Sequence, residues 1–152
     1  MVYYKDKKER LSDKFNSAKD FLEEIKKAVK LYYENPNDII GRGMVWYFSD
    51  FTEYIIDICE TYLVANDRYN SRLSGVELIK TAAKYELMDD VLCDFIVKCV
   101  ILRNRFTHDY YKRDVAQNDI IKFCHSDMLY LAIFLEASSE VVKLNYAFNR
   151  DK

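Results

Sequence analysis

The residues with the clearest chemical potential lie in the segment LRNRFTHDYYKRD, at positions 102–114. One of the chain's two histidines, His108, lies in this segment, and two adjacent tyrosines follow it. Between positions 98 and 114 five basic and two acidic residues give a local charge of +3, although the whole chain carries −2. Cations hold phosphate, an imidazole moves protons and aromatic rings stack on bases. This combination is what cleavage of single-stranded RNA requires.

RNA cleavage can proceed without a metal, because the 2′-hydroxyl of RNA is itself a nucleophile. The protein need only help to remove its proton, protonate the leaving oxygen and stabilise charge on the phosphorane. The four cysteines lie inside apolar stretches with no CxxC spacing, which is typical of buried free thiols in a reducing cytosol. We therefore expect neither a metal nor a cofactor.

Helix geometry places the polar residues of this segment relative to one another. Asn104 and His108 are an i,i+4 pair, so the amide could hydrogen-bond and orient the imidazole. Arg103 and His108 are five residues apart, about 140° around a regular helix, which is awkward for two groups that must reach one phosphate. Either the helix is distorted near Phe106, or a second subunit completes the site. By composition alone, a charged and tyrosine-rich helix end is more often solvated surface.

The composition favours a few long helices that position this segment. The 152 residues fit a single domain spanning 1–152, half of them are apolar, and only three glycines and one proline interrupt them. Apolar residues at helical spacing predict helices at about 8–34, 38–66, 75–85 and 116–146, and a fourth in chain order that runs from a turn at 87–90 into the motif segment. Ser74 and Glu77 match a capping box before the short helix. The expected fold is an all-α antiparallel bundle of four long helices and one short one.

The sequence also bears on cellular location. The N-terminal residues MVYYKDKKER become charged before any apolar run develops, unlike a signal peptide. No stretch of eighteen apolar residues is present, so we expect no membrane span and a cytoplasmic protein.

The motif segment resembles the HEPN superfamily, whose ribonuclease motif is an arginine, four residues and a histidine. More narrowly it is similar to the HepT-like toxins, which have the pattern RNxxxHxY. The matching residues here are Arg103, Asn104, His108 and Tyr110. The resemblance extends over about 38–115, through a long helix, a polar loop, a short helix and an apolar helix that runs into the motif.

The resemblance implies a homodimer in which both motifs line one cleft, so that Arg103 of one chain can serve His108 of the other. It implies a metal-independent endoribonuclease toxin that acts on RNA. Its partner would be an MntA-type minimal nucleotidyltransferase, an antitoxin that adds AMP to the motif tyrosine. Arg103 would bind and stabilise the scissile phosphate, Asn104 would orient the site and His108 would be the acid/base. Tyr110 would be the AMPylation site, and further RNA contacts would come from Arg105, Lys112 and Arg113.

Some features of the motif segment depart from the usual pattern, and two other interpretations remain open. Asp109 places a negative charge beside His108, and Tyr111 offers a second hydroxyl for modification. The bundle could instead be a non-catalytic HEPN accessory that binds nucleotide or substrate for a nucleotidyltransferase. It could also be a structural helical bundle without an active site.

Overall fold

Five helices and no strand make up the described part of the chain. The computed structural model describes the backbone of residues 2–108 and 112–150, and the side chains of residues 9–108 and 112–143. The helices are α1 (Val2–Glu34), α2 (Asp38–Ala65), α3 (Gly75–Lys84), α4 (Asp90–His108) and α5 (Arg113–Arg150). The predicted all-α class, with four long helices and one short, is confirmed. The first and last helices, α1 and α5, extend beyond the predicted ranges. The reason is that the prediction follows the apolar stripes alone, and residues beyond those stripes continue the helices.

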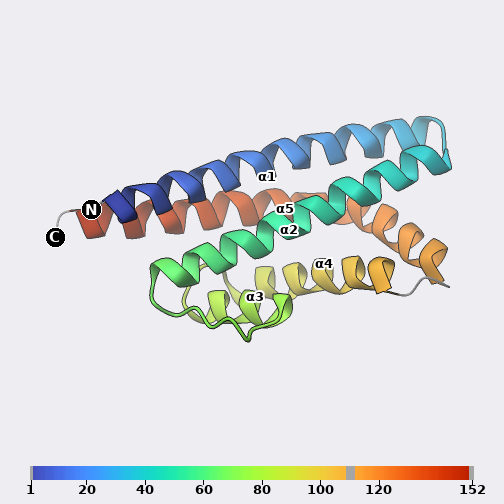
Figure 1. Ribbon diagram of the computed structural model, residues 1–152. Helices are drawn as coiled ribbons and strands as arrows, with labels where there is room; N and C mark the ends of the chain where they lie inside the picture. Colours follow the sequence, from blue (N-terminus) through green and yellow to red (C-terminus); the bar gives the residue numbers. More distant parts are fainter. Residues whose placement is uncertain (1, 109–111, 151–152) are drawn as a thin grey trace.

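The long helices pack as an elongated bundle (Figure 1). α1 and α2 form an antiparallel hairpin joined at residues 35–37, and α5 lies along both of them. α4 packs against α5 and α2, and the short α3 fits between α2 and α4. The C-terminal end of α4, which carries the motif, therefore lies at the same end of the bundle as the start of α2 and the start of α5 (Figure 1).

Three phenylalanine rings join the motif helix α4 to its neighbours α2 and α5. The ring of Phe123 on α5 lies 5.7 Å from that of Phe48 on α2 and stacks at 4.8 Å on that of Phe95 on α4. Burial of a phenylalanine side chain stabilises a fold by about 1.5–3 kcal/mol, and aromatic pairs add to this. This cluster fixes α4 against α2 and α5.

The start of α2 is built for a close approach to α5. Asn37 caps α2 through a 2.7 Å hydrogen bond from the Ile39 amide to its Oδ1. A Cβ on Gly41 would lie 3.1 Å from Nε2 of Gln117, so glycine lets the two helices come close. Nε2 of the buried Gln117 in turn donates to Oδ1 of Asp38 at 3.0 Å. The start of α5 is thereby fixed beside α2.

The short helix α3 begins at the predicted capping box. The Glu77 amide donates to Ser74 Oγ at 3.2 Å, and the Ser74 amide donates to Glu77 Oε2 at 3.3 Å. The inner face of α3 is buried through Leu78, Ile79 and Ala82.

Two further properties concern the described residues only. None of their helices combines the length and the apolar character that crossing a membrane would need. Their His, Cys, Asp and Glu side chains form no group of three or more that could hold a metal ion.

Candidate active site at the end of α4

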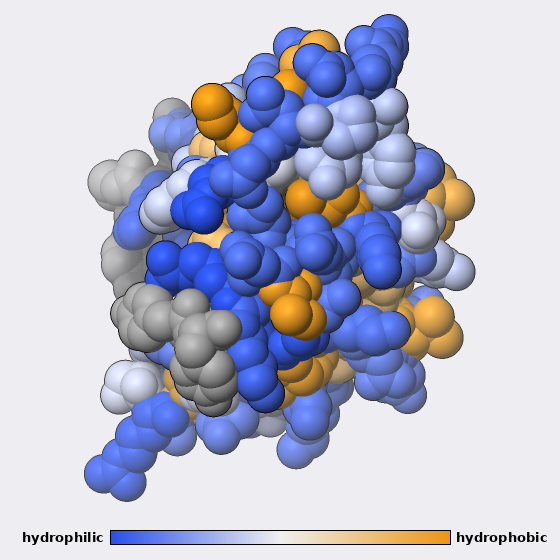
Figure 2. Space-filling model, turned by 90° about the vertical axis from the view of Figure 1, so that its right-hand side faces the viewer, coloured by the Kyte–Doolittle hydropathy of each residue, from blue (hydrophilic) through white to orange (hydrophobic). Residues whose placement is uncertain are grey.

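The motif lies at the last turns of α4, which is a continuous helix as far as His108. A distortion near Phe106 is therefore excluded as the way to bring Arg103 and His108 together. The inner face of α4 is buried through Ile96, Cys99 and Val100, and Arg103 continues this inner line by one turn. His108 is exposed. The end of the bundle where α4 ends is mostly hydrophilic, with small separate apolar patches (Figure 2).

Two neighbours hold the guanidinium of Arg103. Its Nε donates to Oδ1 of Asn104 at 3.1 Å, and its Nη1 forms an ion pair with Oε1 of Glu53 on α2. The Arg103 side chain is only 16% exposed, and burial lowers the pKa of the guanidinium. An arginine remains charged despite such a shift, because its ordinary pKa lies so far above neutrality. The site therefore presents a fixed, partly desolvated cation.

Asn104 acts on the arginine and not on the histidine. Its Oδ1 accepts the hydrogen bond from Arg103, and no hydrogen bond joins the described side chains of Asn104 and His108. The Thr107 hydroxyl donates to the carbonyl oxygen of Arg103 at 3.0 Å, a bond within the last turns of α4. The polar residue after the motif arginine thus orients the cation in this chain.

The predicted RNA-binding residues lie on the α5 side of α4. Arg105 is two residues beyond Arg103, about 200° around the helix, and its Nη2 pairs with Oδ2 of Asp119 on α5 at 3.0 Å. The Arg113 guanidinium lies 5.3 Å from the centre of the Phe106 ring, and Lys112 is exposed at the start of α5. One chain thus places Arg103 on the α2 side and the other three cations at the α4–α5 junction.

Comparison with known proteins supports the same fold. No model of a known protein family matches the sequence, and a search of curated proteins finds no match either. Among solved structures, a tri-AMPylated HEPN toxin from Shewanella oneidensis, in complex with an MNT antitoxin, superposes with a TM-score of 0.75. The two chains are 16% identical, and the alignment covers 86% of this chain and 96% of that one. This chain therefore shares the fold of that HEPN toxin.

The resemblance to HEPN toxins is therefore confirmed at the level of the fold. The proposed modification site, Tyr110, and its neighbours Asp109 and Tyr111 lie outside the described residues. The role of Tyr110 as the AMPylation site stays a prediction.

The candidate site also includes two acidic residues that sequence patterns did not reveal. Glu53 and Asp119 come from α2 and α5 and pair with Arg103 and Arg105. The local charge of +3 is therefore partly balanced within one chain. No local signal indicates either carboxylate, because each meets its arginine only through the packing of different helices.

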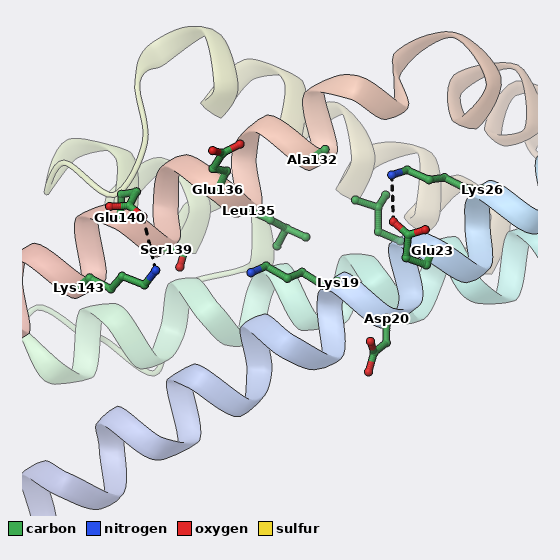
Figure 3. Close-up of a pocket in the computed structure, with 11 residues that line it drawn as sticks. Lys19, Asp20, Glu23, Lys26, Ala132, Leu135, Glu136, Ser139, Glu140 and Lys143 are labelled. Carbon is green, nitrogen blue, oxygen red and sulfur yellow. Dashed lines mark hydrogen bonds and ion pairs between the residues drawn. The ribbon is translucent and has the colours of Figure 1, made fainter.

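The HEPN fold also carries a groove between α1 and α5, with a volume of about 430 Å³, that contains no motif residue (Figure 3). Two of its three lysines are paired: Lys26 meets Glu23 at 3.0 Å, and Lys143 meets Glu140 at 3.5 Å. Because lysines and carboxylates line the groove in nearly equal numbers, the groove favours the binding of neither an anion nor a cation. The end of α4 remains the stronger candidate site.

Proposed function

We propose that this chain is a metal-independent endoribonuclease toxin of a HEPN–nucleotidyltransferase toxin–antitoxin pair. One observation carries the proposal: a HEPN toxin fold presents a fixed Arg103 and an exposed His108 at the end of one helix. A half-buried guanidinium stabilises developing charge more strongly than one in water. An exposed imidazole is available to exchange protons with a bound substrate.

In the proposed reaction the 2′-oxygen of RNA attacks the adjacent phosphorus and the bond from phosphorus to the 5′-oxygen breaks. The proton of the 2′-hydroxyl passes to an imidazole, and a proton is delivered to the leaving 5′-oxygen. His108 performs these transfers, and Arg103 stabilises the charge on the phosphorane.

A second copy of the chain completes the site in this proposal. On a regular α4, Arg103 and His108 point in directions about 140° apart, so one chain does not aim both at one phosphate. The outer face of α2 supports a contact beside the motif: Trp46 lies two turns before Glu53 and is 66% exposed, and Ile39 is 79% exposed. In a symmetric dimer, two histidines and two arginines would share one cleft.

The partner is a minimal nucleotidyltransferase of the MntA type in this proposal. The solved HEPN toxin that shares the fold is in complex with an MNT antitoxin and carries AMP groups. For this chain we assign the modification to Tyr110. The four cysteines of this chain are buried free thiols, in keeping with a protein that acts in the reducing cytoplasm.

The test incubates the purified protein with total RNA in EDTA. Cleavage should persist, and DNA should stay intact because it lacks the 2′-hydroxyl. His108→Ala and Arg103→Ala should each lower the rate by about 10²-fold or more. His125→Ala is the matched control, since His125 is the other histidine and its ring contacts Tyr33 on α1, at 4.2 Å between centroids. Equal cleavage by wild type and the His108 variant would refute the proposal, and binding of the nucleotidyltransferase without RNA cleavage would favour the non-catalytic accessory.

A further inference from the structure

The contact between Glu53 and Arg103 joins a residue outside the motif to the proposed catalytic cation. We propose that Glu53 is a positioning residue, which together with Asn104 holds the Arg103 guanidinium in the orientation that receives the scissile phosphate. This inference rests on the proposed ribonuclease function. It adds to the active site a residue from α2, a helix that carries no part of the motif.

The geometry of the guanidinium supports this role. Arginine has five N–H groups in a rigid planar fork. Asn104 binds Nε and Glu53 binds Nη1, so two points on the fork are held by groups on two different helices. Two tethers on a planar group fix its plane. The Nη2 group remains for a phosphate oxygen, and a charge-assisted bond to phosphate depends strongly on direction.

Burial explains why a second tether is needed. Arg103 extends the inner line of α4, and its side chain is 16% exposed, whereas the Glu53 side chain is 57% exposed. Without a partner on α2, a guanidinium in this position would gain hydration by swinging outward, away from its present orientation. Because the carboxylate itself is largely solvated, the ion pair contributes little to fold stability. Removing Glu53 should therefore change the reaction more than the fold.

The charge of Glu53 has a second effect on the reaction. A carboxylate next to the arginine repels an incoming phosphate, so it weakens substrate binding while it improves the geometry of the bound state. Loss of Glu53 should lower kcat and should also lower KM. A merely structural role would lower the active fraction and leave KM unchanged.

The neighbouring Asp57 provides a matched control. It lies on α2 one turn after Glu53, and its Oδ2 pairs with Nζ of Lys14 on α1 at 3.4 Å. Asp57→Asn therefore removes one negative charge from the same helix without touching the motif arginine.

The experiment compares RNA cleavage by wild type, Glu53→Ala, Glu53→Gln, Asp57→Asn and Arg103→Ala. Glu53→Ala should lower kcat about tenfold or more and should also lower KM. Glu53→Gln keeps an oxygen acceptor without the charge, so it should restore most of kcat and keep the lower KM. Asp57→Asn should match wild type. NMR of the arginine side chain should show slow guanidinium rotation for Arg103 in wild type and faster rotation in Glu53→Ala. Thermal unfolding confirms that each variant is folded.

The outcomes separate this inference from the proposed function. If Arg103→Ala loses cleavage while Glu53→Ala keeps the wild-type kcat and KM, Glu53 does not position the arginine and the ribonuclease proposal stands. Faster cleavage by Glu53→Ala would overturn the inference too, since Glu53 would then restrain the arginine. If wild type and Arg103→Ala are equally inactive, the ribonuclease proposal fails and the role of Glu53 fails with it.

Discussion

Arg103 and His108 lie on different sides of α4: the arginine is packed beside Glu53 on α2, and the histidine is exposed at the last residue of the helix. If both act on one phosphate, a second copy must supply one of them. We therefore expect a two-fold symmetric dimer in solution. Sedimentation at micromolar concentration should give about twice the chain mass of 18.1 kDa. A pure monomer that still cleaves RNA would contradict this prediction.

A shared site also predicts recovery of activity between two inactive variants. Arg103→Ala and His108→Ala subunits, mixed and allowed to exchange, should form mixed dimers with one intact pair of Arg103 and His108. With random exchange, cleavage should recover to about a quarter of the wild-type rate. The control mixes the double variant Arg103→Ala/His108→Ala with wild type. A dimer of one wild-type and one double-variant chain should contain no intact shared pair. No recovery after proven exchange would mean that both residues act within one chain.

The two glycines of α2 should respond in opposite ways to alanine. Gly43 has no atom within 4 Å of an added Cβ, so Gly43→Ala should raise the free energy of unfolding by about 0.5–1 kcal/mol through helix propensity. At Gly41 an added Cβ meets Nε2 of Gln117 at 3.1 Å and Cδ1 of Ile121 at 3.2 Å. Gln117 is held by Asp38, so Gly41→Ala should lower stability. Urea unfolding at one fixed protein concentration measures both, and an equal gain would argue against the close packing of α2 on α5.

The buried cysteines predict a loss of stability at alkaline pH. Burial raises the pKa of Cys124 from its ordinary 9.0 to about 12, and it also raises the pKa values of Cys59 and Cys99. These thiols stay neutral in the folded state while they ionise near pH 9 in the unfolded chain. The free energy of unfolding should therefore fall as pH rises from 9 toward 12, by up to about 1.4 kcal/mol per pH unit for each thiol. Urea unfolding at several pH values measures the slope, and Cys124→Ala should make it shallower. An unchanged slope in that variant would contradict the assignment.

Modification of Tyr110 should inactivate the protein without unfolding it. An attached AMP brings about one negative charge, which would pair with the basic residues of the motif segment, and a bulky base, which would occupy the space of an RNA base. Co-expression with the cognate nucleotidyltransferase should add one or more AMP masses to the intact protein. The added mass should be lost in Tyr110→Phe and kept in Tyr111→Phe. Inhibition of an unmodified protein by the partner would point to complex formation alone.

Local patterns in the sequence determined the helices and the position of the motif. The i,i+3 and i,i+4 spacing of apolar residues gave all five helices, because one face of each helix must be buried. The capping box at Ser74 and Glu77 was equally local and is present. The angular separation of Arg103 and His108 also followed from the sequence, because a continuous helix fixes it.

Only the tertiary structure decided which groups surround the motif arginine. The i,i+4 spacing predicts that Asn104 orients His108, but Asn104 binds Arg103, since both the amide and the guanidinium lie where α4 meets α2. Glu53 and Asp119 reach their arginines from other helices, and the role of Gly41 as a close contact depends on where α5 crosses α2. These contacts depend on how helices that are distant in the chain pack against one another. Helical periodicity defines which face of a helix is buried, but it does not specify which residue of another helix that face contacts.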